Sequence, residues 1–340
     1  DTFILSVAGS IAGAGTAALG LAADVIVMDK TVLAHIDSAA QVHAKKDVIV
    51  AALSKEDILA IGAAGSAAGT AGLAGSASAL DLETTTRAYL AATPSGTGVS
   101  VNAGGDVKIS ALGTLEATLI AGSLGAGGTA GVGASNTTLI HDDTVEAYVG
   151  EAATVTTAGP TGLSVKADSS EDIITIAVAG TGAGTAAVAG SAAVTILDET
   201  TQAYIGRSAT LTATVGSVSL GAKDDTTVVS VAGNLAAAGT AAVGVGADVG
   251  VITKRTQAFV DSNVTANVKR DIIIAAASSE DITSVAAGMS VSGSASIALD
   301  ASVHILDVKT RAFIGDDPSD AVASAGAGDV HAEGNILVSA

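Results

Sequence analysis

The sequence predicts an all-β fold, a parallel β-solenoid (β-helix) made of six tandem repeats. Three observations lead to this prediction. A Gly-Thr/Ser-Ala step recurs six times, a ring-bearing residue follows it at a fixed distance in every copy, and short runs of Val, Ile and Thr alternate with Ala and Gly. A period of two residues is typical of strands, and a long fixed period is typical of stacked repeat coils.

The repeat is defined by two landmarks. The glycines of the recurring step are 54, 59, 56, 55 and 54 residues apart, at Gly15, Gly69, Gly128, Gly184, Gly239 and Gly293. In every copy an Ala lies 19 residues after this Gly, and the next residue carries a ring. All length variation falls in the other half of the repeat, as at 93–98 and 316–320. These landmarks divide the chain into one elongated array without capping domains, with units at 1–54, 55–113, 114–169, 170–224, 225–278 and 279–340.

The ring position predicts a structural ladder. Its six members are His35, Tyr89, Tyr148, Tyr204, Phe259 and Phe313. In a solenoid, equivalent residues of successive repeats lie above one another. Stacked aromatic neighbours add about 0.5–1.5 kcal/mol per pair, so a ladder explains one ring per repeat without a sugar ligand.

Within a unit, the pattern predicts about five short strands with turns at Gly pairs, at Asp-Glu and at the rare Pro. Both sets of alternate positions in these strands are apolar, which favours a parallel sheet buried on both faces. A repeat can be wound as three coils of about 18 residues or as one wide, flattened coil. Because no 18-residue self-similarity occurs inside a unit, we expect the wide coil.

Composition excludes several classes of partner and site. The 340 residues carry 15 basic and 34 acidic side chains, a net charge of −19, which argues against binding to nucleic acid or anionic membranes. Cys is absent, so disulfides and thiolate metal sites are excluded. One long uncharged run, Ile58 to Leu80, is mostly Ala, Gly and Ser, so we expect no membrane insertion.

An acidic position lies 14 residues after each repeat Gly, with Thr253 as its one exception. Two interpretations are open. In one, which we favour, the side chains cap turns through local backbone amides; in the other, they form a column that Ca²⁺ bridges. The column would contain Asp29, Glu83, Asp142, Asp198 and Asp307. We expect the acidic pairs Glu56-Asp57, Glu171-Asp172 and Glu280-Asp281 to make turns before a strand.

No enzyme signature stands out. The sequence has no G-x-S-x-G elbow, and its glycine clusters recur in every unit without a following helix. The five histidines, at 35, 43, 141, 304 and 331, lack a metal-ligand spacing. We therefore predict no catalytic residue and no cofactor other than the possible calcium.

The fourth unit resembles a known family most closely, through the segments Val188–Asp198 and Thr201–Gly206. It is similar to the repeats of filamentous haemagglutinin-like and leukotoxin-like giant adhesins of Gram-negative bacteria. This resemblance implies an exported bacterial β-solenoid shaft at the cell surface, acting in adhesion, biofilm or surface assembly. It also implies that receptor binding lies elsewhere in the molecule.

Our leading hypothesis is therefore a structural shaft. The chain begins at a repeat boundary, ends at a unit end and has no polar caps, so we expect further repeats or further copies end to end. Cell-surface or matrix components are the other expected partners. The alternative is a surface- or polysaccharide-binding module, and a polysaccharide-cleaving enzyme is a third, less favoured hypothesis.

Overall fold

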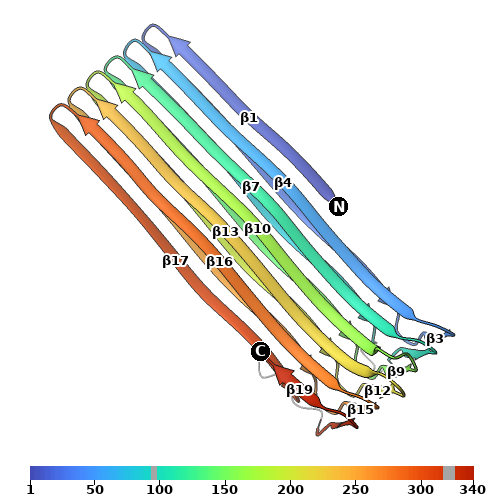
Figure 1. Cartoon of the computed structure of the whole chain (residues 1–340). Coiled ribbons are helices and arrows are strands. Elements are labelled where there is room, and N and C mark those ends of the chain that lie inside the picture. The colour runs from blue at the N-terminus through green and yellow to red at the C-terminus, as the bar shows by residue number, and fades with distance from the viewer. Residues whose placement is uncertain (93–97, 317–325) are drawn as a thin grey trace.

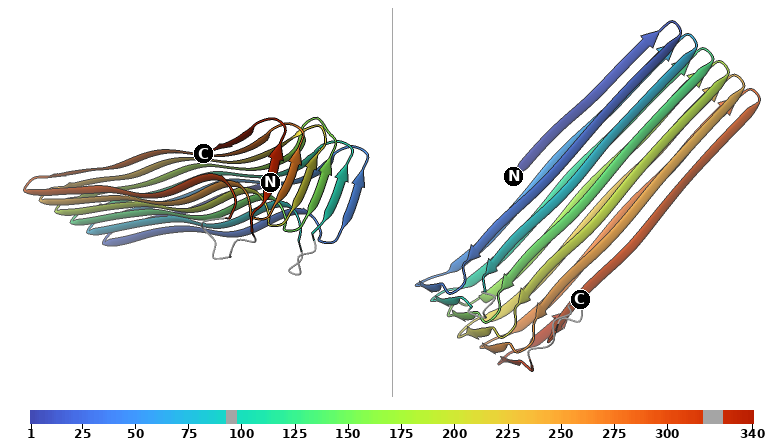
Figure 2. Two further views of the ribbon diagram at one scale, coloured as in Figure 1. Left: turned by 90° about the horizontal axis from the view of Figure 1, so that it is seen from below. Right: turned by 180° about the vertical axis from the view of Figure 1, so that it is seen from behind.

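The computed structural model describes residues 1–92, 98–316 and 326–340, and in these ranges the regular elements are all strands. One turn of the solenoid, called a rung here, uses one complete repeat. A long strand runs out to a narrow tip, a second long strand returns, and a four-residue strand closes the wide end (Figure 1). Figure 2 shows the resulting flat stack from below and from behind.

The strands form three parallel sheets, called A, B and C here. Sheet A contains the outgoing strands β1 (Thr2–Ala14), β4 (Val48–Ala68), β7 (Val107–Gly127), β10 (Gly162–Ala183), β13 (Ser217–Ala238), β16 (Ile272–Ser292) and the short β19 (Ile336–Ser339). Sheet B contains the returning strands β2 (Ala17–Ile36), β5 (Ala71–Leu90), β8 (Ala130–Val149), β11 (Ala186–Ile205), β14 (Ala241–Val260) and β17 (Ala295–Ile314). Sheet C contains β3 (Gln41–Ala44), β6 (Ser100–Ala103), β9 (Thr154–Thr157), β12 (Thr210–Ala213), β15 (Thr265–Val268) and β18 (Asp329–Ala332).

The register confirms the predicted fold class and the wide coil. Strand partners are always one repeat apart, so that Tyr204 pairs with Tyr148 on one side and with Phe259 on the other. A winding of three coils per repeat is thereby excluded. The unit boundaries drawn from the sequence, such as 54/55 and 169/170, fall inside strands of sheet A.

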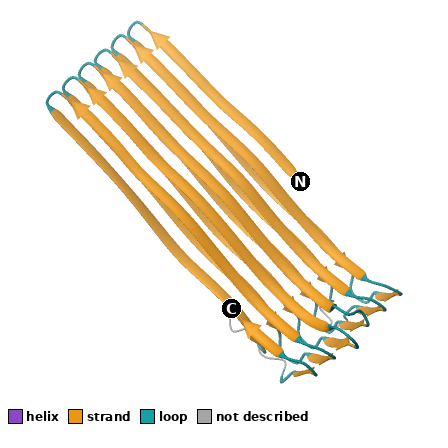
Figure 3. Cartoon of the chain, viewed as in Figure 1, coloured by secondary structure: helices purple, strands orange, loops and turns teal. Residues whose placement is uncertain are grey.

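The prediction of about five short strands per unit is wrong, because a complete rung has three strands and two of them are about 20 residues long (Figure 3). The Gly pairs at 104–105 and 127–128 do lie between strands or at a strand end, but many other glycines lie inside the long strands. A Cβ on Gly72 would lie 2.0 Å from the carbonyl oxygen of Ala126, and one on Gly133 would lie 2.6 Å from that of Gly180. Near the tip, sheets A and B thus approach too closely for a side chain at these positions.

The recurring Gly-Thr step forms the turn at the tip. A Cβ on Gly69 would lie 2.1 Å from the carbonyl oxygen of Gly15, and one on Gly128 would lie 2.0 Å from that of Gly69. The amide of Thr70 donates to the carbonyl oxygen of Thr16, 3.0 Å away, so the turns themselves are hydrogen-bonded from rung to rung. Backbone stacking, and not a bound phosphate, therefore accounts for this glycine column.

The interior changes character from the wide end to the tip. At the wide end the three sheets enclose a large apolar core that includes Leu90, Ile109 and Leu163. A second, aliphatic cluster lies nearer the tip and includes Ile58 and Leu139, and beyond it only small Ala clusters remain. Between the two large clusters, charged and hydroxyl side chains cross the interior, and this region contains the candidate site.

Candidate cation site and surface ladders

The six ring-bearing residues stack on the outer face of sheet B, as the fixed 19-residue offset predicts. Successive ring centroids are 4.7–4.9 Å apart, and the ring planes are inclined by 4–9°. Burial raises the pKa of Tyr148 to about 12, so its phenol stays protonated at neutral pH. The column contains His35, Tyr89, Tyr148, Tyr204, Phe259 and Phe313 and joins the rungs without any ligand.

The acidic position also forms a column, but it does not lie in turns. Asp29, Glu83, Asp142, Asp198, Thr253 and Asp307 are neighbours in register, exposed, in the middle of the sheet B strands. The turn interpretation is wrong, because backbone amides inside a paired strand already donate to the next rung. The column offers one carboxylate per rung, whereas Ca²⁺ takes six to eight oxygens, and calcium bridging stays a prediction.

The second acidic set was also predicted wrongly, because strands β4, β10 and β16 run straight through it. Alternation sends the two members of each pair to opposite faces. In the pair of β10, Glu171 is buried and Asp172 is exposed. The inward members therefore reach the interior of the solenoid.

There they belong to a set of side chains that we call the buried polar band. It crosses the interior between the two large apolar clusters, with one column from sheet B and two from sheet A. The band consists of Lys30, Thr84, Asp143, Glu199 and Lys254 from sheet B, and of Ser54, Glu56, Ser169, Glu171, Asp224, Thr226 and Glu280 from sheet A.

Lysines neutralise the two ends of the band. At one end, Lys30 Nζ lies 2.5 Å from Glu56 Oε1. At the other, the fully buried Lys254 pairs with Asp224, and its Nζ lies 3.2 Å from Glu199 Oε2 and 3.5 Å from Glu280 Oε1. The described part of the band thus has six carboxyl groups and two lysines.

The middle of the band has more hydrogen-bond acceptors, which are carboxylate oxygens, than hydroxyl protons to donate to them. Ser169 Oγ lies 2.8 Å from Asp143 Oδ2 and 2.6 Å from Glu171 Oε1, yet a hydroxyl has one proton to donate. Thr226 Oγ1 likewise lies 2.8 Å from Glu171 Oε2 and 3.1 Å from Glu199 Oε2. Burial, together with the charges of Glu199 and Asp224, raises the pKa of Glu171 well above its ordinary value. The band must therefore hold additional protons or a bound cation.

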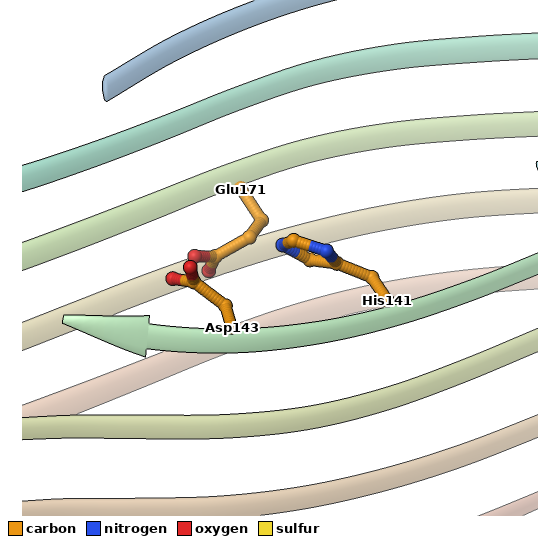
Figure 4. A group of neighbouring side chains, drawn as sticks. All are labelled: His141, Asp143 and Glu171. Atoms are coloured by element: carbon orange, nitrogen blue, oxygen red, sulfur yellow. The ribbon is translucent and has the colours of Figure 1, made fainter. Parts of the chain in front are cut away.

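A buried histidine faces this middle section. The His141 ring, which is 2% exposed, places Nδ1 3.2 Å from the carbonyl oxygen of Leu82. Figure 4 shows the imidazole and the carboxylates of Asp143 and Glu171 pointing toward one another. One ligand atom from each of these three residues lies within 4.8 Å of the others, and the same holds for Glu171, Glu199 and Asp224. Both groups have the donor atoms that a divalent cation needs.

Sequence reasoning missed this band. The search for histidine ligands considered spacing along the chain, whereas His141 and Glu171 come from facing sheets. One usable signal was present, since Ser-x-Glu recurs at Ser54–Glu56, Ser169–Glu171 and Ser278–Glu280. In a strand this spacing places a hydroxyl and a carboxylate on the same face.

Compared with known proteins, the chain matches no family model, no curated sequence and no solved structure. The resemblance to giant adhesin repeats therefore remains a hypothesis that rests on the sequence motifs. Within the described residues, no helix has the length and hydrophobicity to cross a membrane.

The band predicts that stability falls as the pH rises. Burial, followed by the charge of Asp224, raises the pKa of Glu199 from 4.5 to about 8, although Lys254 lowers it. The folded chain thus holds this proton more tightly than the unfolded chain. Its stabilisation is complete below about pH 4.5 and is lost as the pH rises toward 8.

We expect the urea midpoint to decrease over this pH range in a chelator-containing buffer. Glu199→Gln, which resembles the protonated acid, should flatten the decrease, and Glu83→Gln on the exposed column should leave it unchanged. An equally steep decrease in Glu199→Gln would show that another group is responsible.

Proposed function

We propose that this chain is part of a structural shaft, a stiff filament or stalk whose repeats supply length. The observation that carries the proposal is the in-register, parallel stacking of successive repeats in all three sheets. Each of the central rungs joins its neighbours along two strands of about 20 residues and one of four. Separating two rungs would break all these hydrogen bonds together, which favours a rigid rod.

The residues that repeat most regularly support the same proposal. The tip glycines serve backbone stacking, and the rings contact the rings of adjacent rungs. A position that recurs in every rung for stacking suits a structural repeat, since each rung stabilises the next.

The biological setting follows from the resemblance alone. We propose an extracellular bacterial location at the cell surface, with a role in adhesion, biofilm or surface assembly. Its partners would be continuing repeats or further copies end to end, and cell-surface or matrix components.

Electron microscopy with fibre diffraction tests the shaft. We expect long unbranched fibres with an axial repeat of about 4.8 Å, and a rise of about 29 Å for six rungs. Compact particles without that repeat would contradict the shaft and favour the alternative of a surface- or polysaccharide-binding module.

A further inference from the structure

We propose that the buried polar band binds one divalent transition-metal ion of the zinc type, with His141, Asp143 and Glu171 as its ligands. The ion would lie between sheets A and B and would join β8 to β10. This site is distinct from the exposed acidic column, because its side chains point to the opposite face of sheet B.

The first argument is the position of the histidine. His141 occupies an inward column of sheet B in which every other rung has an aliphatic side chain. Those side chains are Met28, Leu82, Leu197, Ile252 and Leu306. Packing alone would be satisfied by another aliphatic residue, and a buried imidazole without a polar partner is costly.

The second argument is the orientation of the ring. With Nδ1 hydrogen-bonded to the carbonyl oxygen of Leu82, the lone pair of the neutral ring is on Nε2, the nitrogen nearer the carboxylates in Figure 4. A backbone carbonyl that accepts from the other ring nitrogen is the usual support of a metal-binding histidine.

The third argument is charge. Among the described residues, no lysine forms an ion pair with Asp143 or Glu171, and Oε1 of the fully buried Glu199 has no hydrogen-bond partner. A divalent ion would offset the excess of carboxylates, while Ser169, which contacts both acids, would orient them. A His with two carboxylates suits zinc-type ions better than calcium, which prefers oxygen ligands alone.

To bind an ion, the three ligand atoms need to move only slightly closer to one another. Bonds of about 2.0–2.1 Å place tetrahedral ligands about 3.4 Å apart. The three ligand atoms lie within 4.8 Å of one another, so side-chain rotations can bring them to a common ion.

The test is refolding with and without metal. The chain would be unfolded in chelator, refolded with Zn²⁺ or Co²⁺, dialysed, and analysed for metal by mass spectrometry. We expect one ion per chain and a visible Co²⁺ spectrum typical of four-coordinate sites. His141→Leu, which restores the aliphatic column and should fold, is expected to lower the affinity by about 100-fold. Asp142→Asn, on the exposed face of the same strand, should leave it unchanged.

Two results would overturn the proposal. One is a folded wild-type chain that retains no ion, which would mean that protons neutralise the band. The other is full retention of metal by His141→Leu. If that variant fails to fold, Glu171→Gln, which keeps the shape and the Ser169 contact, decides in its place.

A second inference rests on the outer face of sheet A. Its residues from Leu5 to Gly13, together with their partners in the other five rungs, include no charged side chain. This area is about 30 Å by 29 Å, on the order of 900 Å². That exceeds the roughly 800 Å² per partner that a stable interface buries, and an exposed apolar patch of this size marks a contact site.

One column of this face alternates large and absent side chains over its first five rungs and ends on a second large side chain. Its members, in register, are Ile11, Gly65, Leu124, Gly180, Leu235 and Met289. Ile11 is 95% exposed and Leu124 is 63% exposed, and a shallow hollow lies beside Gly65. Over those five rungs the column thus has ridges and hollows with a period of two rungs, about 9.6 Å.

We infer that a second copy of this chain packs face to face on this surface. Only another stack of rungs has ridges with the same period, so the ridges of one copy can enter the hollows of the other. Flat sheets are commonly stabilised by such stacking. A lipid surface would gain nothing from the alternation.

Gly180→Leu distinguishes a second copy from a lipid surface as the partner, because the change adds apolar area but fills a hollow. A Cβ there would meet only the flexible end of Leu124, so the variant should fold. By sedimentation velocity we expect the wild type to associate in pairs, Gly180→Leu to lose at least tenfold in association constant, and Gly190→Leu, on the outer face of sheet B, to pair as the wild type does.

A wild-type chain that remains monomeric at high concentration would overturn this inference, as would pairing that is unchanged in Gly180→Leu. Flotation of both the wild type and Gly180→Leu with phosphatidylcholine vesicles would assign the face to lipid instead.

Discussion

Inserting one alanine between Ala193 and Val194, in the middle of β11, is expected to abolish the folded solenoid. Because side chains alternate between faces, the insertion reverses every residue from Val194 to Ile205. Leu197 would move to solvent and Asp198 into the interior, while the pairing with β8 and β14 would keep either the register or the burial, but not both. The loss should exceed the total stability of a typical domain, about 5–15 kcal/mol.

Circular dichroism and urea unfolding would measure this loss. The matched control is one alanine inserted after Ser95, which lies outside the described residues in a segment where the sequence itself varies in length. Lengthening a connection costs well under about 1 kcal/mol, so the control should unfold much like the wild type. A cooperative transition near the wild-type midpoint for the β11 insertion would contradict the assigned register.

Replacing Lys254 with methionine is expected to destabilise the chain by about 3–5 kcal/mol, the cost of removing one partner from a buried ion pair. The ammonium group is fully buried and contacts three carboxyl groups, and it donates to Thr226 Oγ1 at 2.6 Å. Methionine has a similar length, so the change removes the charge and the hydrogen bonds while leaving little cavity. Urea unfolding at neutral pH measures the effect.

Lys269→Met is the matched control, since its partner Glu333 and Lys269 itself are both about half exposed. Exposed pairs contribute about 0–1 kcal/mol, so this variant should stay close to the wild type. Combining Lys254→Met with Glu199→Gln and Asp224→Asn should recover most of the lost stability, because the two fully buried carboxyl groups that Lys254 contacts are then neutral, and only the partly exposed Glu280 remains. Failure of the recovery would mean that Lys254 acts by packing.

The sequence alone predicted the ring ladder, for a specific reason. The tip Gly and the ring of each repeat lie at the two ends of the same returning segment, as Gly184 lies two residues before the start of β11 and Tyr204 lies one residue before its end. A single strand has no loop in which a residue can be added. A constant offset in the sequence therefore becomes the same position along the strand in every rung. The same reasoning placed Asp198 in a column, although it could not exclude a turn.

The strand count could not be predicted because a glycine has two different uses. At Gly69 it allows turns to stack, and at Gly72 it allows two sheets to approach, and both uses leave the same letter in the sequence. Only the facing sheet distinguishes them. The long strands were therefore divided by turns that do not exist.

The repeat period by itself determined the axial order of the chain: what lies above what, with one rung per repeat. The tertiary structure decided what lies opposite what. Asp142 and Asp143 are adjacent in sequence, yet one is exposed in the acidic column and the other is buried beside Glu171. Contacts across the interior depend on how sheets A and B are offset when the tip turn closes. The side chains there differ from rung to rung, so no periodic signal encodes them, and packing alone brings His141, Asp143 and Glu171 together.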